Sequence, residues 1–175
     1  LAEAIETYAA PLADDPAAEG ADRTFADDAA RRAAATEAVA AVEGGMAGDI
    51  ARLYEADIAL ADGDTARARE AWEGFLREHD DHILAATVEL NLIALDRAEG
   101  QGEDVVARLE RALNNPARTL PEDAVLYELG VTLEALGRDD EAMPHFQRLV
   151  DDFPSSPYIT EASRRVSADA PTLPA

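Results

Sequence analysis

Apolar residues recur at helical spacing in two short segments on either side of Gly137. The first segment carries an apolar face on positions that share one side of a helix, namely Leu126, Leu129, Gly130, Leu133 and Leu136. The second carries a matching face on Ala142, Phe146, Leu149 and Phe153. Pro154 then prevents the helix from continuing. Small residues at Gly130 and Ala142 would let the two backbones approach closely. The pattern predicts a helical hairpin over residues 124–156.

The same pattern recurs upstream at a constant spacing. The glycines expected at the turns, Gly63, Gly100 and Gly137, lie 37 residues apart. Three sets of apolar positions keep this register, namely Ala68 with Val105 and Ala142, Trp72 with Leu109 and Phe146, and Phe75 with Ala112 and Leu149. Four classes of position in one register predict three hairpins, at about residues 47–79, 83–114 and 122–152.

Two features of the second helix in each hairpin bear on its geometry. A carboxylate stands where each of these helices should begin and is expected to cap its amide groups, at Asp64, at Glu103 and at either Asp139 or Asp140. Pro144 lies just past the first turn of the last such helix. It cannot donate a hydrogen bond to Asp140, so we expect a kink there.

The segments that flank the hairpins are also predicted to be helical. Residues 1–22 predict a short helix followed by a proline-containing loop, and a longer helix from about 24 to 42 should begin at Thr24 as its cap. Residues 157–168 predict a capping helix, which a stack of repeats needs to cover its open end. One domain is therefore expected over residues 23–169, with a tail at 170–175.

The hairpin over residues 124–156 resembles a tetratricopeptide repeat, because it alternates large and small residues and ends in a proline. The resemblance implies an all-α fold, a right-handed α-α superhelix of about three hairpins with N-terminal helices and a C-terminal capping helix. In this family the first helix of each hairpin lines a concave surface that binds an extended peptide or a partner helix. The resemblance therefore implies a non-catalytic protein–protein interaction module.

Transferring the family's groove positions onto this register selects a set of residues that are mainly apolar or acidic, namely Leu53, Asp57, Leu90, Ala94, Arg97, Tyr127, Val131 and Glu134. Chaperone-binding members hold a peptide carboxylate with lysine, asparagine and arginine at such sites, and this set does not reproduce them. The resemblance thus implies an apolar partner segment, or occupation of the groove by the chain's own N-terminal helices. The alternative is that these residues are ordinary packing between helices.

The charge and composition of the chain narrow the class of partner. The formal net charge is −22, from 37 acidic and 15 basic residues, and every basic residue is arginine. Such a chain repels phosphate backbones and anionic headgroups, which argues against nucleic-acid binding and peripheral membrane binding. No apolar run approaches the roughly 18 residues of a membrane span, so we expect no direct membrane insertion. The absence of cysteine excludes disulfides and thiolate metal sites.

Candidate chemistry is sparse. The segment His79-Asp80-Asp81-His82 offers two imidazoles and two carboxylates that could bind zinc or a similar cation. Adjacent side chains diverge, however, and polar residues are usual between hairpins, so we interpret the segment as a solvated turn. We expect no metal and no cofactor. The serines lie near the end of the chain and fit no nucleophile pattern, so we expect no catalytic residue and no enzyme.

The end of the last repeat, FPSSPYITEASRRV, is similar to the signature of the bacterial outer-membrane assembly lipoprotein and of Tol-associated coordinator proteins. The helical lead-in and GDTARAREAWEGFL resemble the membrane-tethered ancillary subunit of the Sec translocon. These resemblances imply an extracytoplasmic, periplasmic adaptor or accessory subunit of a membrane-associated complex, tethered through a segment before Leu1. Its partners would be proteins of that complex. The alternatives are a soluble cytoplasmic scaffold or co-chaperone, and a ligand- or metal-responsive regulator.

Overall fold

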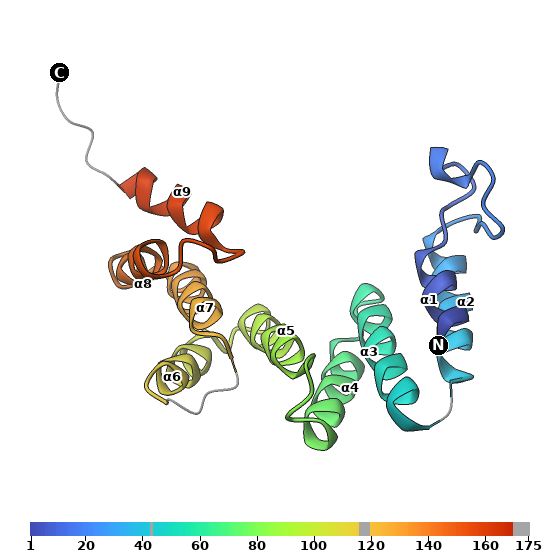
Figure 1. Cartoon of the computed structure of the whole chain (residues 1–175), viewed down its shortest axis with the longest axis horizontal. Helices are drawn as coiled ribbons and strands as arrows, with labels where there is room; N and C mark the ends of the chain where they lie inside the picture. The colour runs from blue at the N-terminus through green and yellow to red at the C-terminus, as the bar shows by residue number, and fades with distance from the viewer. Residues whose placement is uncertain (43, 116–119, 170–175) are drawn as a thin grey trace. The chain divides into compact units, whose positions relative to one another are not determined.

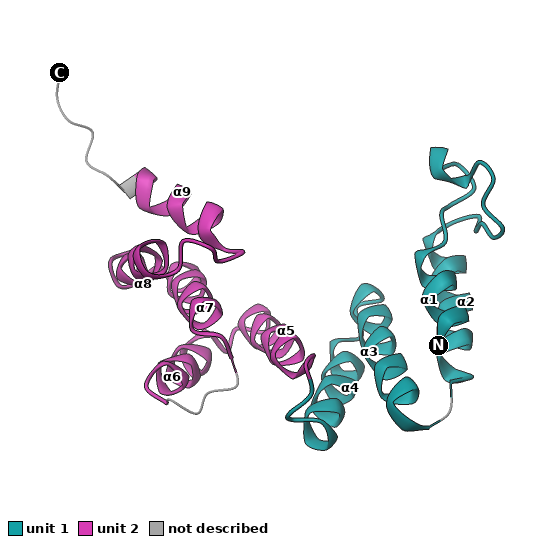
Figure 2. Cartoon of the chain, viewed as in Figure 1, with its two compact units in different colours: residues 1–82 teal, residues 83–175 magenta. Residues whose placement is uncertain are grey.

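The computed structural model describes residues 1–42, 44–115 and 120–169. Within these ranges the chain forms helices α1 to α9 and one short 3-10 helix, with an isolated bridge between Leu12 and Phe25 and no β-strand, which confirms the all-α fold class (Figure 1). The chain divides into two compact units, an N-terminal unit of residues 1–82 and a C-terminal unit of residues 83–175 (Figure 2). The tail expected at residues 170–175 lies outside the described residues.

The N-terminal unit is a chain of antiparallel neighbours with an alanine-rich core. Its elements are α1 (Ala2–Ala9), a 3-10 helix (Pro16–Ala18), α2 (Asp28–Ala40), α3 (Gly45–Ala61) and α4 (Thr65–Glu78). Helix α1 packs on α2, α2 on α3, and α3 on α4. The side chains at the first two of these contacts are mostly small, with Ala4, Ala35, Val39, Ala51 and Ile58 forming one buried cluster. Small side chains let helix axes come close, so the many alanines of this unit allow its helices to pack tightly.

The longer helix expected from Thr24 begins later, and its predicted cap is wrong. Helix α2 starts at Asp28, and Asp27 caps it by accepting a hydrogen bond of 2.8 Å from the amide of Ala30. The reason is a backbone pairing upstream. The amide of Ala13 donates to the carbonyl of Phe25 at 2.8 Å, and the amide of Phe25 donates to the carbonyl of Pro11 at 3.2 Å. This pairing holds Phe25 in an extended conformation, so the helix can start only after it.

The C-terminal unit contains the larger apolar core. Its helices are α5 (Ala85–Ala98), α6 (Gly102–Leu113), α7 (Glu122–Ala135), α8 (Asp139–Asp152) and α9 (Ile159–Asp169), and each packs on the next. The core draws on every one of these helices, with Ile93, Val105, Leu109, Leu126, Leu129, Phe146, Leu149 and Ala162 among its buried members. The apolar repeat positions of this unit, Val105, Leu109, Ala142, Phe146 and Leu149, therefore lie in its core.

The turn at each repeated glycine has the same backbone geometry. Gly63, Gly100 and Gly137 have φ angles of +81°, +84° and +72°, which side chains with a Cβ rarely adopt. At the last turn the amide of Gly137 donates to the carbonyl of Glu134 at 2.9 Å, and the amide of Arg138 donates to the carbonyl of Leu133 at 2.9 Å. This pair of bonds is the Schellman motif, and the other two turns repeat it. The spacing of the glycines thus reflects a shared way of ending the first helix.

Only one of the expected acidic caps is present. Asp64 caps α4 by accepting a hydrogen bond of 3.1 Å from the amide of Arg67. Helices α6 and α8 instead follow Gln101 and Arg138, and neither residue makes a side-chain cap bond. The prediction was wrong for Glu103, Asp139 and Asp140 because these residues lie inside the first turn, past the position from which a side chain reaches the free amides. There they still complement the helix dipole.

Two residues of the α7–α8 hairpin occupy unusual positions. A Cβ added at Gly130 would lie 2.5 Å from two carbons of the Phe146 ring, so the ring packs directly on the α7 backbone. The sequence predicted a close approach of the two backbones at Gly130 and Ala142, and the structure shows that the Phe146 ring fills the space at Gly130. Pro144 lies inside α8 and is exposed. The kink expected there stays a prediction.

Helix α8 also carries a histidine whose protonation should affect stability. Burial lowers the pKa of the His145 imidazole below its ordinary 6.5, while Glu110 of α6 acts in the opposite direction. The folded state therefore disfavours the charged imidazole, and stability should be lost as the pH falls below about 6.5. We expect His145→Gln to lose less stability than the unmodified protein between about pH 7.5 and about pH 5.5, as measured by urea denaturation. Equal losses in the two proteins would contradict this.

Candidate interaction surface

The eight predicted groove residues lie on the first helix of each hairpin. Leu53 and Asp57 are on α3 in the N-terminal unit. The other six are on two helices of the C-terminal unit, with Leu90, Ala94 and Arg97 on α5 and Tyr127, Val131 and Glu134 on α7. Residues four and three apart share one face of a helix, so each triplet forms a single row. We call these two rows the α5/α7 face.

An ion pair joins Arg97 of the α5 row to Glu128, which lies on α7 beside the second row. Nη1 of Arg97 lies 2.5 Å from a carboxylate oxygen of Glu128, and it donates to the hydroxyl of Thr132 at 3.3 Å. The side chains of Arg97 and Glu128 are 21% and 12% exposed, so solvent screens the pair only in part. The cation predicted for the groove therefore fixes α5 against α7 and is not free to hold a ligand carboxylate.

Tyr127 packs against the segment that leads into α9. Its ring stacks on that of Tyr158, with centroids 4.5 Å apart and planes at 15°, and meets the edge of Phe146 at 6.3 Å. Burial raises the pKa of both tyrosine hydroxyls above the usual range. The ring is only half-buried, so one of its sides still contributes to the surface.

Glu134 is likewise engaged by α9. Nε of Arg165 donates to its carboxylate at 2.8 Å, and the same guanidinium lies 5.1 Å from the centroid of the Phe146 ring. Such an arrangement combines an ion pair with a cation–π contact. The charged residues of the α5/α7 face thus serve the contacts between helices, and they leave little net charge on the face itself.

The remaining residues of the face are apolar and accessible to different degrees. Ala94 is exposed, whereas Leu90 and Val131 are half-buried and pack against the core of the C-terminal unit. Together these residues give the face an apolar strip that is partly accessible to solvent. Such a strip can bind an apolar side chain or helix through burial of surface, and it offers no group for covalent or acid–base chemistry.

The two predicted residues of the N-terminal unit differ in their surroundings. Leu53 is half-buried on α3. Asp57 is exposed as a residue, yet partial burial raises the pKa of its carboxyl above the ordinary 3.8. A partly desolvated carboxylate is stabilised by a cationic or hydrogen-bonding partner. This desolvation could not be predicted from the sequence.

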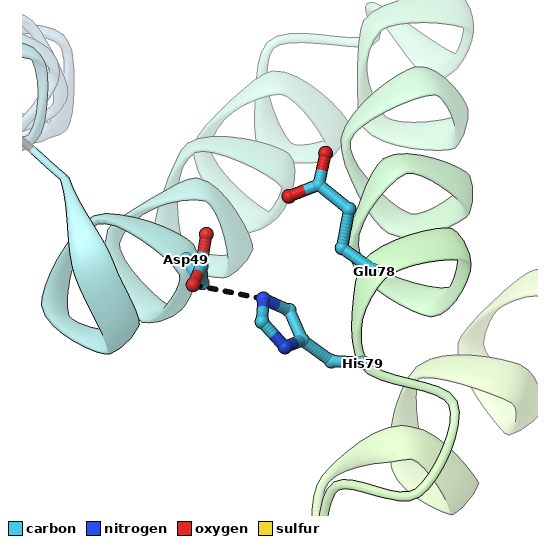
Figure 3. A group of neighbouring side chains, drawn as sticks. All are labelled: Asp49, Glu78 and His79. Carbon is cyan, nitrogen blue, oxygen red and sulfur yellow. Dashed lines mark ion pairs between the residues drawn. The ribbon is translucent and has the colours of Figure 1, made fainter.

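The segment 79–82 does not converge on one point, but one of its histidines meets carboxylates from elsewhere. Asp80 and Asp81 are exposed, and the ring of His82 lies edge-on to Phe75 at 5.5 Å. Nε2 of His79 lies 2.8 Å from a carboxylate oxygen of Asp49 on α3, with Glu78 alongside (Figure 3). Sequence reasoning missed Asp49, because only the packing of α3 on α4 brings together positions thirty residues apart.

No helix of the described residues is both long enough and apolar enough to cross a membrane.

Comparison with known proteins adds one finding on family. The family model described as tetratricopeptide repeat matches residues 124–156, which cover all but the first two residues of α7, the whole of α8 and the four residues after it. No curated protein and no solved structure matches the chain, so no homologue supports the resemblance to cell-envelope members. The match supports the resemblance of the hairpin at residues 124–156 to a tetratricopeptide repeat.

Proposed function

We propose that this protein is an extracytoplasmic adaptor or accessory subunit of a membrane-associated complex, which binds an apolar segment of a protein partner on the α5/α7 face. The coarser part of this proposal, a protein–protein interaction module, is supported by the tetratricopeptide repeat at residues 124–156. That fold is in general non-catalytic. The location outside the cytoplasm and the membrane complex rest on the similarity of the last repeat to cell-envelope proteins.

One observation carries the choice of surface. The α5/α7 face is the part of the predicted groove in which two first helices are joined directly, through Arg97 and Glu128, while an exposed alanine leaves room beside them. The rigid ion pair fixes the spacing of the rows before a partner arrives. A preformed surface loses less entropy on binding than one that must first be ordered.

Placing a long charged side chain on this face should block binding without disturbing the fold. Ala94→Arg adds bulk and charge at an exposed position of α5, and arginine has high helix propensity. We expect it to weaken partner binding by roughly tenfold or more, because a desolvated charge in an apolar contact is costly. The matched control is Ala107→Arg, which makes the same change at an exposed position of α6. Equal binding by the two variants, with equal helicity, would contradict partner binding on the α5/α7 face.

The partner and the location are tested together by affinity purification of the full-length protein from gently solubilised membranes. The proposal expects a stoichiometric membrane protein that copurifies with the unmodified chain and with Ala107→Arg, and is depleted with Ala94→Arg. Recovery of the protein only in the soluble fraction, without such a partner, would overturn the adaptor role and favour a cytoplasmic scaffold or co-chaperone.

A further inference from the structure

Three side chains that can bind a metal ion converge where α4 ends against α3. Asp49 comes from α3, Glu78 is the last residue of α4, and His79 follows it directly (Figure 3). One ligand atom from each lies within 4.8 Å of the other two. These residues belong to the N-terminal unit and lie apart from the α5/α7 face in sequence and in role. We propose that Asp49, Glu78 and His79 bind one divalent transition-metal ion of the zinc class.

Nε2 of His79 is positioned to bind the metal ion. Nε2 of His79 is shielded from solvent, although the side chain as a whole is 31% exposed, and none of the described residues forms a hydrogen bond with it. A carboxylate oxygen of Asp49 lies 2.8 Å from this nitrogen, within ion-pair distance, but the two atoms do not form a hydrogen bond. The ring of Phe75, 5.2 Å away, supports the imidazole from one side. A buried nitrogen without a hydrogen bond is costly, and a metal ion would satisfy it.

The local charge favours a cation. Asp49 and Glu78 contribute two carboxylates, and the site lies at the C-terminal end of α4, where unpaired carbonyl groups make the potential negative. Arg52 is a cation already close to the site, with Nη1 3.5 Å from Glu78 and 3.8 Å from Asp49. Its side chain is 51% exposed and these contacts are long, so Arg52 can swing into solvent when an ion binds.

The ligand set selects the class of ion. Imidazole suits zinc, cobalt, nickel and copper, whereas calcium and magnesium prefer oxygen ligands alone. Tetrahedral zinc, with bonds of about 2.0–2.1 Å, needs its ligand atoms roughly 3.3 Å apart. The present spread is up to 4.8 Å, so a modest rotation is required. Glu78 is exposed, so its side chain can make this rotation once Arg52 releases it. A cavity of about 440 Å³, which Asp49 and Glu78 help to line, has room for a water as fourth ligand.

Bound metal would fasten the end of α4 to α3. Ligands from two helices fix the hairpin in the folded state only, so the ion stabilises that state by mass action. Zinc should therefore raise the melting temperature of the protein.

The test is a zinc titration of the full-length, tag-free protein after treatment with a chelator, in competition with a chromophoric chelator. We expect one equivalent of zinc that persists in a large excess of magnesium. Glu78→Gln, at an exposed position, should weaken that equivalent by at least tenfold, and so should His79→Gln. Arg52→Gln should strengthen it, because a competing cation is removed. Cobalt then serves as a spectroscopic probe of imidazole ligation.

The matched control is His82→Gln, which removes the other histidine of the same turn and should leave the zinc equivalent unchanged. Weak binding of several ions that magnesium displaces would show only the general acidity of the chain and would overturn the proposal. So would an affinity that falls equally in His79→Gln and His82→Gln. Neither result affects the partner-binding role of the α5/α7 face, which Ala94→Arg tests separately.

Discussion

Replacing Gly130 with alanine is expected to lower the free energy of unfolding by about 1–3 kcal/mol, although alanine is the better helix former by about 1 kcal/mol. The new Cβ would lie 2.5 Å from two ring carbons of Phe146, which is fully buried in the core of the C-terminal unit. Neither the ring nor the α7 backbone can withdraw without opening that core. The steric cost therefore exceeds the gain in propensity. Urea denaturation followed by far-ultraviolet circular dichroism measures the change.

A second glycine provides the matched control. Gly74 lies inside α4, and the nearest atom to a Cβ there is Nη2 of Arg77 at 3.6 Å, an ordinary contact at the end of a flexible side chain. Gly74→Ala should therefore stabilise the protein by about 0.5–1 kcal/mol. Combining Gly130→Ala with Phe146→Leu should recover part of the loss, because the smaller side chain relieves the clash. If both glycine variants stabilise the protein, the close contact between α7 and α8 is refuted.

Replacing Pro144 with alanine should have the opposite effect and stabilise the protein by about 1–2 kcal/mol. Pro144 is the sixth residue of α8, so it denies Asp140 a hydrogen bond and its ring crowds that carbonyl. A helix-interior proline costs about 3 kcal/mol relative to alanine. Proline also restricts the unfolded chain, which offsets roughly 1 kcal/mol of this cost. The position is exposed, so alanine leaves no cavity.

Pro154 is the control for this prediction. It follows Phe153, the residue at which α8 ends, and it too is exposed. Proline after a helix breaks no hydrogen bond of the helix, so Pro154→Ala should be neutral or slightly destabilising through the unfolded state alone. Chemical denaturation of the two variants under one set of conditions makes the comparison. Stabilisation of equal size in both variants would mean that Pro144 does not strain α8.

Much of the fold follows from sequence because its signals are local. The turns can be predicted from their glycines, because the backbone geometry there is one that other residues avoid. The close contact between helices can be predicted from Gly130, because this residue has no side chain. The start of α2 was misplaced because a pairing between Pro11 and Phe25, fourteen residues apart, overrides the capping signal of Thr24. Competition between a local cap and a non-local contact cannot be resolved from composition alone.

The surface was harder to foresee than the fold. Tyr127 and Glu134 can be placed on the first helix of a repeat from their register, but their contacts with Tyr158 and Arg165 depend on how α9 packs. Asp49 carries no signal at all in the sequence, since it becomes a neighbour of His79 only when two helices adopt a particular rotation about their axes. Side chains that meet across helices need the packed structure.

Trp72, on α4, gives the molecule a built-in optical label. It is the single tryptophan of the chain and is 2% exposed, whereas each unit contains two of the four tyrosines. Excitation of the indole alone therefore reports on the N-terminal unit, and the helical ellipticity reports on both. Coincident transitions of the two signals would mean that the units melt cooperatively. An ellipticity change that precedes the shift in emission would reveal the C-terminal unit opening by itself, so the chain can be dissected without attaching a dye.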